Sequence, residues 1–548
     1  MQFATITGTV TAVSDITFSI PQGKVVAIVG ESGSGKSVTA MSILQLHPIT
    51  ITTYTGSITY NDPKKQINLL TCNKQQLQQL RGHKIAMIFQ EPMTALNPVL
   101  TCGNQVIEML QQHLGLTYGD ALKKTISLFA DVQIPQPEQA VKKYPHQLSG
   151  GQKQRVMIAM AMSCNPQLLI CDEPTTALDV TVQKNILLLL KQLQKKYGLS
   201  ILFISHDLGL VNNIADEVIV MYKGKIIEQG SAKQILQTPQ QPYTKALLAC
   251  RPMLYSKGQR LPLVADFMQN PNFVVNKPVL TQLVNVYNTP LFELDDVTIQ
   301  YPTKHNILGK ATNFFTAINK ITLTIYQGET LGVVGESGSG KTTLGHALLL
   351  LNKASSGVIN YEGNNIATLN RQTKKNYRKQ VQIIFQDPYS SLNPKLTIGA
   401  AISETLLVNK ICTKKAEAKT RVLQLLQQVE LLPEHYYRYP HEFSGGQRQR
   451  IVIARALAMQ PSFVVCDESV AALDVSVQAQ ILNLLNDLKK LYGFTILFIS
   501  HDLGVVKYIS DRIAVMQMGQ IVECNTAENI FANPTHEYTK KLLEAIPN

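Results

Sequence analysis

No stretch of this 548-residue sequence holds the roughly 18 uncharged apolar residues that a membrane-spanning helix needs. The apolar runs at residues 186–190 and 348–351 are far too short. Residues 1–5 also lack the basic segment and apolar core of a secretion signal. We therefore expect a chain that does not cross a membrane by itself and that works in the cytoplasm.

Cysteine is sparse, with 8 residues scattered along the chain and no C-x-x-C pair. This pattern favours free thiols in a reducing compartment over a disulfide or zinc framework. Glycine (32) and proline (25) are too few for a collagen-like or disordered chain. The 51 Lys+Arg against 38 Asp+Glu give a net charge of +13, which is spread too thinly to identify an anionic partner.

An internal repeat organises the sequence. Short motifs recur in the same order, beginning at Gly30 and Gly335, at Ser149 and Ser444, and at Cys171 and Cys466. The pattern predicts two copies of one module, residues 1–250 and 291–548, joined by a linker at residues 251–290. The linker is rich in Pro and Asn and shows no clear 3.6-residue period, so we expect extended chain there.

Each copy places a glycine-rich octet between an apolar strand pattern and a helical pattern, which is the context of a phosphate-binding P-loop. Glycines let backbone N–H groups wrap phosphates, a lysine reaches the terminal phosphates, and a hydroxyl can contact Mg²⁺. A plain glycine-rich turn is the alternative, and the repetition in the same context argues against it. The octets are Gly30, Glu31, Ser32, Gly33, Ser34, Gly35, Lys36 and Ser37, and Gly335, Glu336, Ser337, Gly338, Ser339, Gly340, Lys341 and Thr342.

Two carboxylates end a later apolar strand in each copy, at Asp172 and Glu173 and at Asp467 and Glu468. The aspartates are candidates to hold Mg²⁺, and the glutamates could polarise an attacking water for in-line displacement. Strands that merely end in solvated acids are the alternative. The cysteines before the aspartates are most simply small buried residues.

The sequences Leu-Ser-Gly-Gly-Gln and Phe-Ser-Gly-Gly-Gln resemble the signature of the ABC ATPase family. The matching signature residues are Ser149, Gly150, Gly151, Gln152, Ser444, Gly445, Gly446 and Gln447. The remaining family motifs follow in order: Q-loops at Gln90 and Gln386, D-loops at Ala177-Leu178-Asp179 and Ala472-Leu473-Asp474, and switch histidines at His206 and His501. The resemblance covers nearly the whole chain.

The resemblance implies an α/β fold with two tandem ABC ATPase domains. Each domain would combine a P-loop RecA-like core, an antiparallel β subdomain and an α-helical signature subdomain. The family binds ATP and Mg²⁺, with the Q-loop glutamines also near the metal and the switch histidines at the γ-phosphate. Its geometry implies two composite sites, because the signature of one domain faces the P-loop of the other. The Ser-Gly-Gly at a helix N-terminus suits a phosphate.

The resemblance also implies an aromatic platform for adenine upstream of each P-loop, at Tyr301 and Phe3. Few residues precede Phe3, so the first copy has no counterpart of the strand pattern at residues 291–300. We expect either that the natural protein begins further upstream or that the first copy tolerates a shortened sheet. The second copy also departs from the family pattern after the acidic pair: it has Ser469 where the first copy has Pro174. Glu468 is intact, so we expect activity to survive.

Further segments are similar to the ATP-binding subunits of bacterial dipeptide/oligopeptide importers, here fused in one chain. They are the Q-loop continuations at residues 90–98 and 386–394, Tyr144-Pro145-His146, Tyr439-Pro440-His441, Pro242-Tyr243-Thr244 and His536-Glu537-Tyr538-Thr539. The partners implied are two integral membrane permease subunits and a substrate-binding protein, at the cytoplasmic face of the bacterial inner membrane. Only Cys250 lies where relatives bind an iron–sulfur cluster, so we expect none. His146 and His441 are more simply structural.

The alternative of a different class is a soluble duplicated ABC factor acting on the ribosome. Such factors carry a long, charged helical linker, whereas residues 251–290 hold few charges and several prolines. A nucleic-acid repair ATPase is disfavoured, because zinc-type Cys pairs and a basic aromatic stripe are absent. The sequence leaves the cargo open among dipeptides, oligopeptides, glutathione, nickel and peptide antibiotics.

Overall fold

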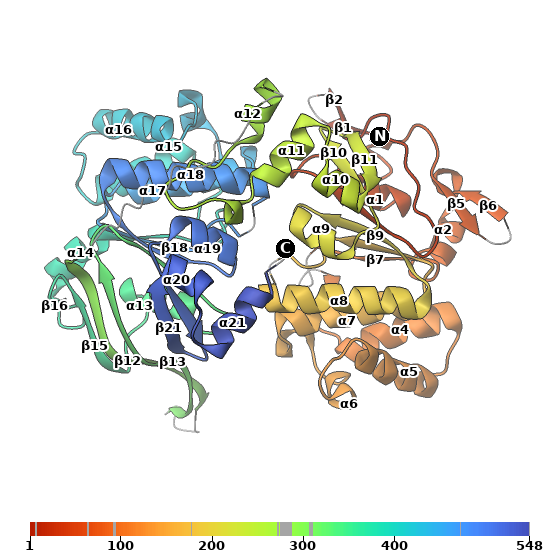
Figure 1. The fold of residues 1–548 in the computed structure, drawn as a ribbon, viewed down its shortest axis with the longest axis horizontal. Helices are drawn as coiled ribbons and strands as arrows, with labels where there is room; N and C mark the ends of the chain where they lie inside the picture. Colours follow the sequence, from red (N-terminus) through yellow and green to blue (C-terminus); the bar gives the residue numbers. More distant parts are fainter. Residues whose placement is uncertain are drawn as a thin grey trace.

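The computed structural model describes residues 1–5, 8–62, 65–90, 95–176, 178–270, 273, 288–305, 311–471 and 473–546. The two halves of the chain lie side by side, the first in red to yellow and the second in green to blue (Figure 1). In the described part of the chain, no helix combines the length and the apolar character needed to cross a bilayer.

A six-stranded sheet forms the centre of each half, with the order β11-β10-β3-β9-β8-β7 in the first and β21-β20-β14-β19-β18-β17 in the second. All neighbours are parallel except the pairs β10/β11 and β20/β21. The first sheet comprises β3 (Val25–Val29), β7 (Ile85–Ile88), β8 (Leu168–Asp172), β9 (Ser200–Ser205), β10 (Glu217–Tyr222) and β11 (Lys225–Ser231). The second comprises β14 (Thr330–Val334), β17 (Val381–Ile384), β18 (Phe463–Asp467), β19 (Thr495–Ile499), β20 (Arg512–Gln517) and β21 (Gln520–Thr526).

The central strands are buried along their whole length, as continuous apolar runs in a parallel sheet require. The P-loop follows β3, the acidic pair ends β8, and His206 follows β9. These three strands are neighbours in the order β3-β9-β8. Their carboxyl ends therefore meet at one edge, where open α/β sheets bind ligands. The second half repeats the arrangement with β14, β19 and β18.

Helical subdomains separate β7 from β8 and β17 from β18. The first contains α4 (Cys102–Leu114), α5 (Tyr118–Asp131), α6 (Pro137–Ala140), η2 (Pro145–Gln147) and α7 (Gly150–Met162). The second contains α15 (Ile398–Val408), α16 (Lys415–Gln428), η4 (Pro433–Tyr437), η5 (Pro440–Glu442) and α17 (Gly445–Leu457). The helices α7 and α17 begin within the signature motifs, so each signature lies at a helix N-terminus.

The other helices of the first half are α1 (Lys36–Ile43), η1 (Leu69–Thr71), α2 (Lys74–Leu80), α8 (Val180–Tyr197), α9 (Leu208–Ile214), α10 (Ala232–Gln237) and α11 (Pro242–Ala249). Those of the second half are α13 (Lys341–Leu348), α14 (Arg371–Gln380), α18 (Val475–Tyr492), α19 (Leu503–Ile509), α20 (Ala527–Ala532) and α21 (Glu537–Glu544). Helix α8 lies beside α21 of the other half, and Lys184 donates to the carbonyl of Glu544 at 2.8 Å (Figure 1).

The antiparallel subdomains differ in size. The first half has β1 (Gln2–Thr5), β2 (Gly8–Thr11) and β4 (Thr52–Thr53), with a separate hairpin of β5 (Thr59–Asp62) and β6 (Lys65–Asn68). The second has β12 (Pro290–His305), β13 (Ala311–Tyr326), β15 (Ser356–Tyr361) and β16 (Asn364–Asn365). The first strand thus has 4 residues in one half and 16 in the other. Phe3 pairs with Val10 as Tyr301 pairs with Phe315, so the two aromatics correspond by register.

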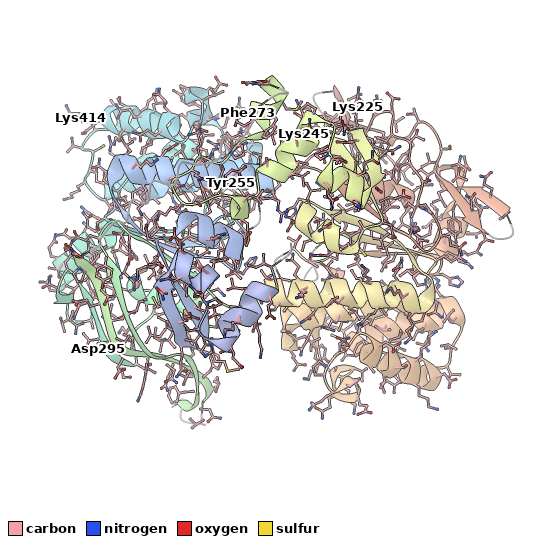
Figure 2. All side chains as sticks on the ribbon, viewed as in Figure 1. Lys225, Lys245, Tyr255, Phe273, Asp295 and Lys414 are labelled. Carbon is pink, nitrogen blue, oxygen red and sulfur yellow. The ribbon has the colours of Figure 1, made fainter. Side chains whose placement is uncertain are left out.

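The expectation of extended chain throughout the linker is wrong for its described part. Residues 251–270 contain η3 (Pro252–Leu254) and α12 (Val264–Gln269). Leu261 is buried and bonds Asn483 of α18 twice, through its amide and its carbonyl, each at 2.9 Å. Tyr508 of α19 donates to the carbonyl of Gln259 at 2.6 Å. These hydrogen bonds hold residues 259–261 against the second half, whereas α12 packs against α11 of the first half. Figure 2 labels Tyr255 and Phe273 in this segment.

Candidate functional site

The P-loops have a backbone that only glycine adopts without strain. Gly30 and Gly335 have φ of 152° and 154°, and a Cβ there would lie 2.2 Å from a carbonyl oxygen of β10 or β20. Lys36 donates to the carbonyls of Gly30 and Glu31 at 2.7 and 2.8 Å, and Lys341 repeats both contacts. Burial lowers the pKa of both lysines, against the raising influence of nearby carboxylates. The loops are thus preshaped cradles with a buried lysine.

A hydroxyl and a carboxylate meet at the end of each P-loop. Ser37 donates to Asp172 at 2.9 Å, and Thr342 donates to Asp467 at 3.1 Å. Burial raises the pKa of both aspartates. The described residues include no group of three or more His, Cys, Asp or Glu able to hold a metal. The pair fits Mg²⁺ nevertheless, because this ion uses one or two protein ligands and completes its shell with water and phosphate oxygens.

Glu173 and Glu468 are each held by the predicted glutamine and histidine. Gln90 donates to Glu173 at 3.1 Å and His206 Nδ1 lies 3.1 Å from the same oxygen. Gln386 and His501 contact Glu468 at 2.7 and 3.4 Å. Burial raises the pKa of each glutamate, but the histidine's hydrogen bond and charge outweigh it and the pKa is lowered.

The pKa of both histidines shifts in the opposite direction, upward. Burial lowers the pKa of His206 and His501, while the hydrogen bond and charge of the glutamate outweigh it and raise the pKa above its usual value. The glutamate therefore stays ionised next to a histidine that can hold a proton. Such a pair suits proton handling near a phosphate.

The two glutamates also have strained backbones, with φ of 46° at Glu173 and 48° at Glu468. A left-handed conformation is costly for a residue with a side chain and clusters at functional positions. The backbone amide of each glutamate donates to the carbonyl of a residue in β9 or β19, at 3.1 and 2.9 Å. The left-handed backbone and this hydrogen bond together set the direction in which the glutamate side chain points from the end of its strand.

The two sites differ around these glutamates. Thr176 donates to Glu173 at 3.0 Å, whereas the second half has Ala471 at the matching place. Ser469 replaces Pro174 and is buried. Glu468 therefore has one fewer hydrogen-bonding neighbour of this type than Glu173, although its glutamine and histidine contacts are intact.

Residues from the two halves meet at both P-loops. The backbone amide of Ser32 donates to Asp474 at 3.0 Å, and that of Ser337 donates to Asp179 at 2.8 Å. Thr181 adds a hydrogen bond to Glu336 at 2.9 Å. The D-loop aspartate of each half therefore binds the P-loop of the other half.

The signature motifs cap α7 and α17. The Ser149 hydroxyl accepts the backbone amide of Gln152 at 3.3 Å, and the side-chain oxygen of Gln152 accepts the backbone amide of Ser149 at 3.2 Å. Ser444 and Gln447 make the same two bonds. A Cβ on Gly151 or Gly446 would lie 2.8 or 2.4 Å from a valine of α8 or α18. These glycines let each signature pack beside the D-loop that touches the opposite P-loop.

The two residues expected to stack on adenine lie in the antiparallel sheets, Phe3 in β1 and Tyr301 in β12. Phe3 packs edge-on against His47, with ring centroids 5.2 Å apart, and Tyr301 is 38% exposed. His146 and His441 stack on Tyr144 and Tyr439 of their own motifs. Ala177 and Ala472 of the D-loops, residues 91–94 after the first Q-loop, and linker residues 271–272 and 274–287 lie outside the described residues.

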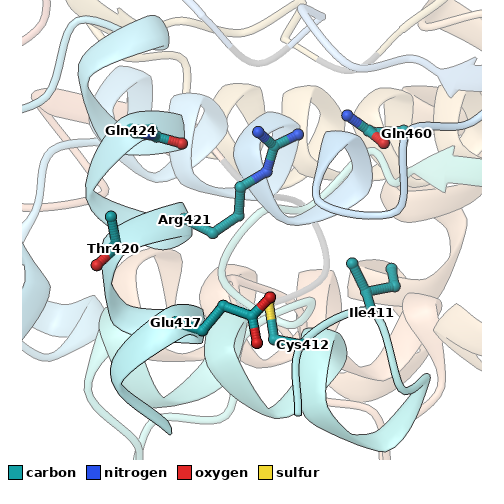
Figure 3. A pocket seen from close by; sticks show the side chains of 7 residues that line it. All are labelled: Ile411, Cys412, Glu417, Thr420, Arg421, Gln424 and Gln460. Atoms are coloured by element: carbon teal, nitrogen blue, oxygen red, sulfur yellow. The ribbon is translucent and has the colours of Figure 1, made fainter. Parts of the chain in front are cut away.

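A surface pocket of about 520 Å³ on the helical subdomain of the second half contains none of the motif residues. Glu417 and Arg421 extend into it from α16 (Figure 3), and burial raises the pKa of the Cys412 thiol. Its lining residues are Ile411, Cys412, Glu417, Thr420, Arg421, Gln424 and Gln460. The chemistry-bearing residues therefore lie elsewhere, at the sheet edges and between the halves.

Two segments of the chain, residues 13–176 and 318–471, match the family described as ABC transporter, and each contains one P-loop, one signature and one acidic pair. This chain belongs to the ABC transporter family. Residues 227–272 and 522–548 match a second description, oligopeptide/dipeptide transporter, C-terminal region. The expected tandem of ABC ATPase domains of the dipeptide/oligopeptide class is confirmed, and the chain is an ABC-type ATPase that binds ATP.

Relatives from two bacteria extend over both halves. The glutathione import ATP-binding protein GsiA of Escherichia coli (strain K12) is 46% identical over 98% of this chain and 87% of its own length. The same-named protein of Pectobacterium atrosepticum is 45% identical over 98% and 86%. Among solved structures, cbiO1 of Clostridium perfringens, part of the ABC transporter complex cbiONQ, covers 45% of this chain and 92% of its own, with 25% identity and a TM-score of 0.39.

Sequence reasoning missed the contacts that depend on the other half or on a distant turn. The tyrosines of the Tyr-Thr motifs hold the P-loop backbone: the Glu31 amide donates to Tyr243 and the Glu336 amide to Tyr538, each at 3.0 Å. The duplicated motif was the available signal, although it gave no role. Thr176 and Thr181 had no signal at all.

Proposed function

We propose that this ABC ATPase powers a peptide-class importer by closing its two halves head to tail around two ATP molecules. The proposal rests on two matching contacts between the halves. Asp474 of the second half accepts the P-loop amide of Ser32, and Asp179 of the first half accepts that of Ser337. Each P-loop then forms a composite site with the signature of the other half, Lys36 with residues 444–447 and Lys341 with residues 149–152.

Within each composite site the P-loop amides and lysine would bind the phosphates. Ser37 and Asp172, with Gln90, and their counterparts Thr342, Asp467 and Gln386 would hold Mg²⁺. That ion, when bound, neutralises phosphate charge during phosphoryl transfer. Tyr301 and Phe3 are proposed to stack on adenine.

Glu173 and Glu468 would accept a proton from the attacking water. Their lowered pKa keeps them ionised at neutral pH. His206 and His501 contact the glutamates and lie after strands that end at the same sheet edge. We propose that they contact the γ-phosphate and orient the glutamate.

Import of a small peptide is supported by the match of both C-terminal segments to the oligopeptide/dipeptide transporter description. The similarity to glutathione importers makes glutathione a candidate cargo. Two membrane permease subunits and a substrate-binding protein are the proposed partners, with the ATPase on the cytoplasmic face of the inner membrane. Val99 and Tyr389, exposed beside the Q-loops, are available for such subunits.

Affinity purification from detergent-solubilised cells tests this function. We expect two integral membrane proteins to copurify, and ATP hydrolysis of the complex to rise with its cognate binding protein and peptide. Copurification of ribosomes in place of membrane proteins would instead support the soluble ribosomal factor. That result would overturn the importer assignment and leave the ATPase assignment intact.

A further inference from the structure

The Tyr-Thr motifs at the starts of α11 and α21 have no part in the chemistry described so far. They occupy the same place in each half and belong to the segments that follow the edge strands β11 and β21. Tyr243 is 1% exposed and Tyr538 is 8% exposed. Both phenol oxygens end at the second residue of a P-loop, where they accept a backbone amide at 3.0 Å.

The residue that each tyrosine holds is fixed from several sides. The amide of Glu31 donates to Tyr243, and its carbonyl accepts from Lys36 at 2.8 Å. Burial raises the pKa of the Glu31 carboxyl, and a hydrogen bond from Ser476 of the other half opposes this. Glu31 therefore connects α11 through its amide, the P-loop lysine through its carbonyl and the opposite half through its carboxyl.

The second half repeats this arrangement. Glu336 donates its amide to Tyr538, accepts Lys341 at its carbonyl at 2.9 Å, and accepts Thr181 of the first half at its carboxylate at 2.9 Å. Ser476 and Thr181 occupy matching places near the starts of α18 and α8. A contact that recurs in two halves of different sequence argues for a shared role.

Both tyrosines stand on anchored helices. In the first half Glu228 of β11 accepts the hydroxyl of Thr244 and the amides of Gln240 and Gln241, at 2.7 and 3.2 Å for the amides. In the second half Glu523 accepts the amides of Thr535 and His536 at 2.9 and 3.1 Å. Each carboxylate bonds the residues that precede α11 or α21. The start of the helix is therefore fixed, and with it the backbone of the tyrosine.

The P-loop needs such support because its glycines leave it free to adopt many conformations. Ordering a flexible loop costs conformational entropy, and that cost would fall on ATP binding. A hydrogen bond from a fixed helix orders the loop before ATP arrives. We propose that Tyr243 and Tyr538 are positioning residues that hold the P-loops in their phosphate-binding shape, each for the ATP site of its own half.

The inference rests on the proposed nucleotide sites, and removal of one hydroxyl tests it. Tyr243→Phe keeps the buried ring and deletes only the acceptor of the Glu31 amide. We expect ATP affinity at the Lys36 site to fall roughly 2- to 10-fold, the usual net value of one hydrogen bond. We expect kcat at saturating ATP to stay unchanged, because Tyr243 bonds the P-loop backbone, whereas Glu173 is held by Gln90, Thr176 and His206.

The measurement uses the full chain with one site disabled. For the Lys36 site, ATP affinity is measured in Lys341→Ala with and without Tyr243→Phe. For the Lys341 site, it is measured in Lys36→Ala with and without Tyr538→Phe. Tyr222→Phe in the Lys341→Ala background is the matched control, since its ring packs 4.4 Å from that of Tyr243. Thermal unfolding of every variant reports on the fold.

Weaker ATP binding with both tyrosine variants, unchanged kcat and an unchanged Tyr222→Phe control would support the positioning role. Unchanged affinity in both variants would overturn it, as would an equal loss from Tyr222→Phe or a loss of kcat without a change in KM. If Tyr243→Phe lowers the unfolding temperature sharply, the more exposed Tyr538 decides. If Lys36→Ala and Lys341→Ala both bind ATP as the wild type does, the nucleotide-site proposal fails instead.

Discussion

The carboxylate of Asp474 accepts the backbone amide of Ser32 at 3.0 Å, although the two residues belong to opposite halves of the chain. The other oxygen of Asp474 accepts the amide of Val477 at 3.0 Å and caps α18. One side chain thus fixes a helix start and the opposite P-loop together. Because the signature glycines pack beside this helix, the contact places both elements at one site.

The double variant Glu173→Gln with Glu468→Gln should bind ATP and hydrolyse it roughly 10²- to 10⁴-fold more slowly, because the amide cannot accept a proton. ATP should then accumulate in a closed form, detectable by gel filtration or small-angle scattering. Single-turnover hydrolysis with labelled ATP measures the rate. Wild-type hydrolysis in the double variant would exclude these glutamates, and an effect only from Glu173→Gln would identify the second site as degenerate.

Asn483→Ala should release the linker from the second half. It removes two buried hydrogen bonds to Leu261, and each unpaired backbone group costs about 1–3 kcal/mol. Hydrogen exchange of residues 259–264 should become faster while exchange of the central strands is unchanged.

Asp487→Ala is the control for this change, because its ion pair with Arg260 is solvent-exposed, with exposures of 55% and 63%. Equal exchange in Asn483→Ala and wild type would show that the linker is held by something else.

Glu523 should stabilise α21 in a pH-dependent way. Although burial raises the pKa of this carboxyl, the nearby hydroxyl of Thr539 and the hydrogen bonds from Thr535 and His536 outweigh it and lower the pKa to about 2. A lowered pKa contributes stability above the unfolded value of about 4.3, and this stability is lost as the pH falls toward 2. Glu523→Gln should therefore speed exchange in residues 537–544 at pH 7, and the difference from wild type should shrink between about pH 4 and 2. A difference that grows on acidification would contradict the assignment.

Tyr301→Ala should weaken ATP binding by about 1 to 3 kcal/mol if adenine stacks on this ring. Phe3→Ala should have a smaller effect, because β1 has 4 residues where β12 has 16. Isothermal titration in the Lys36→Ala and Lys341→Ala backgrounds separates the two sites. Equal losses would show that Phe3 forms a complete platform on its short strand.

The sequence predicted the parts of the fold that depend on local pattern. Continuous apolar runs identified β3 and β8, and the motifs at their ends meet because β3, β9 and β8 are parallel and share an edge. The pairing of Gln90 and His206 with Glu173 follows from that edge. Composition was a poor guide to the linker: Leu261, Val264 and Phe267 recur at a spacing of a helical turn, yet the surrounding Pro and Asn suggested extended chain.

Contacts across the two halves could not be derived from the sequence. The bonds of Asp474 to Ser32 and of Thr181 to Glu336 depend on how the two halves of the chain are placed against one another. The left-handed backbone of Glu173 has no residue-type signal either, because glutamate seldom adopts it. Where family resemblance implied composite sites, only the structure could supply the residues that join them.

Pairing of lysine and signature substitutions tests the head-to-tail sites most directly. Two double variants are compared. The first combines Lys36→Ala with Ser444→Ala, and the second combines Lys36→Ala with Ser149→Ala. Each has one lysine substitution and one signature substitution that removes a helix cap, so the two are matched in kind. We predict that the first pair disables one composite site and retains ATP binding and turnover close to Lys36→Ala alone, whereas the second disables both sites and abolishes turnover. Retained turnover in the second pair with loss in the first, or equal loss in both, would contradict the account.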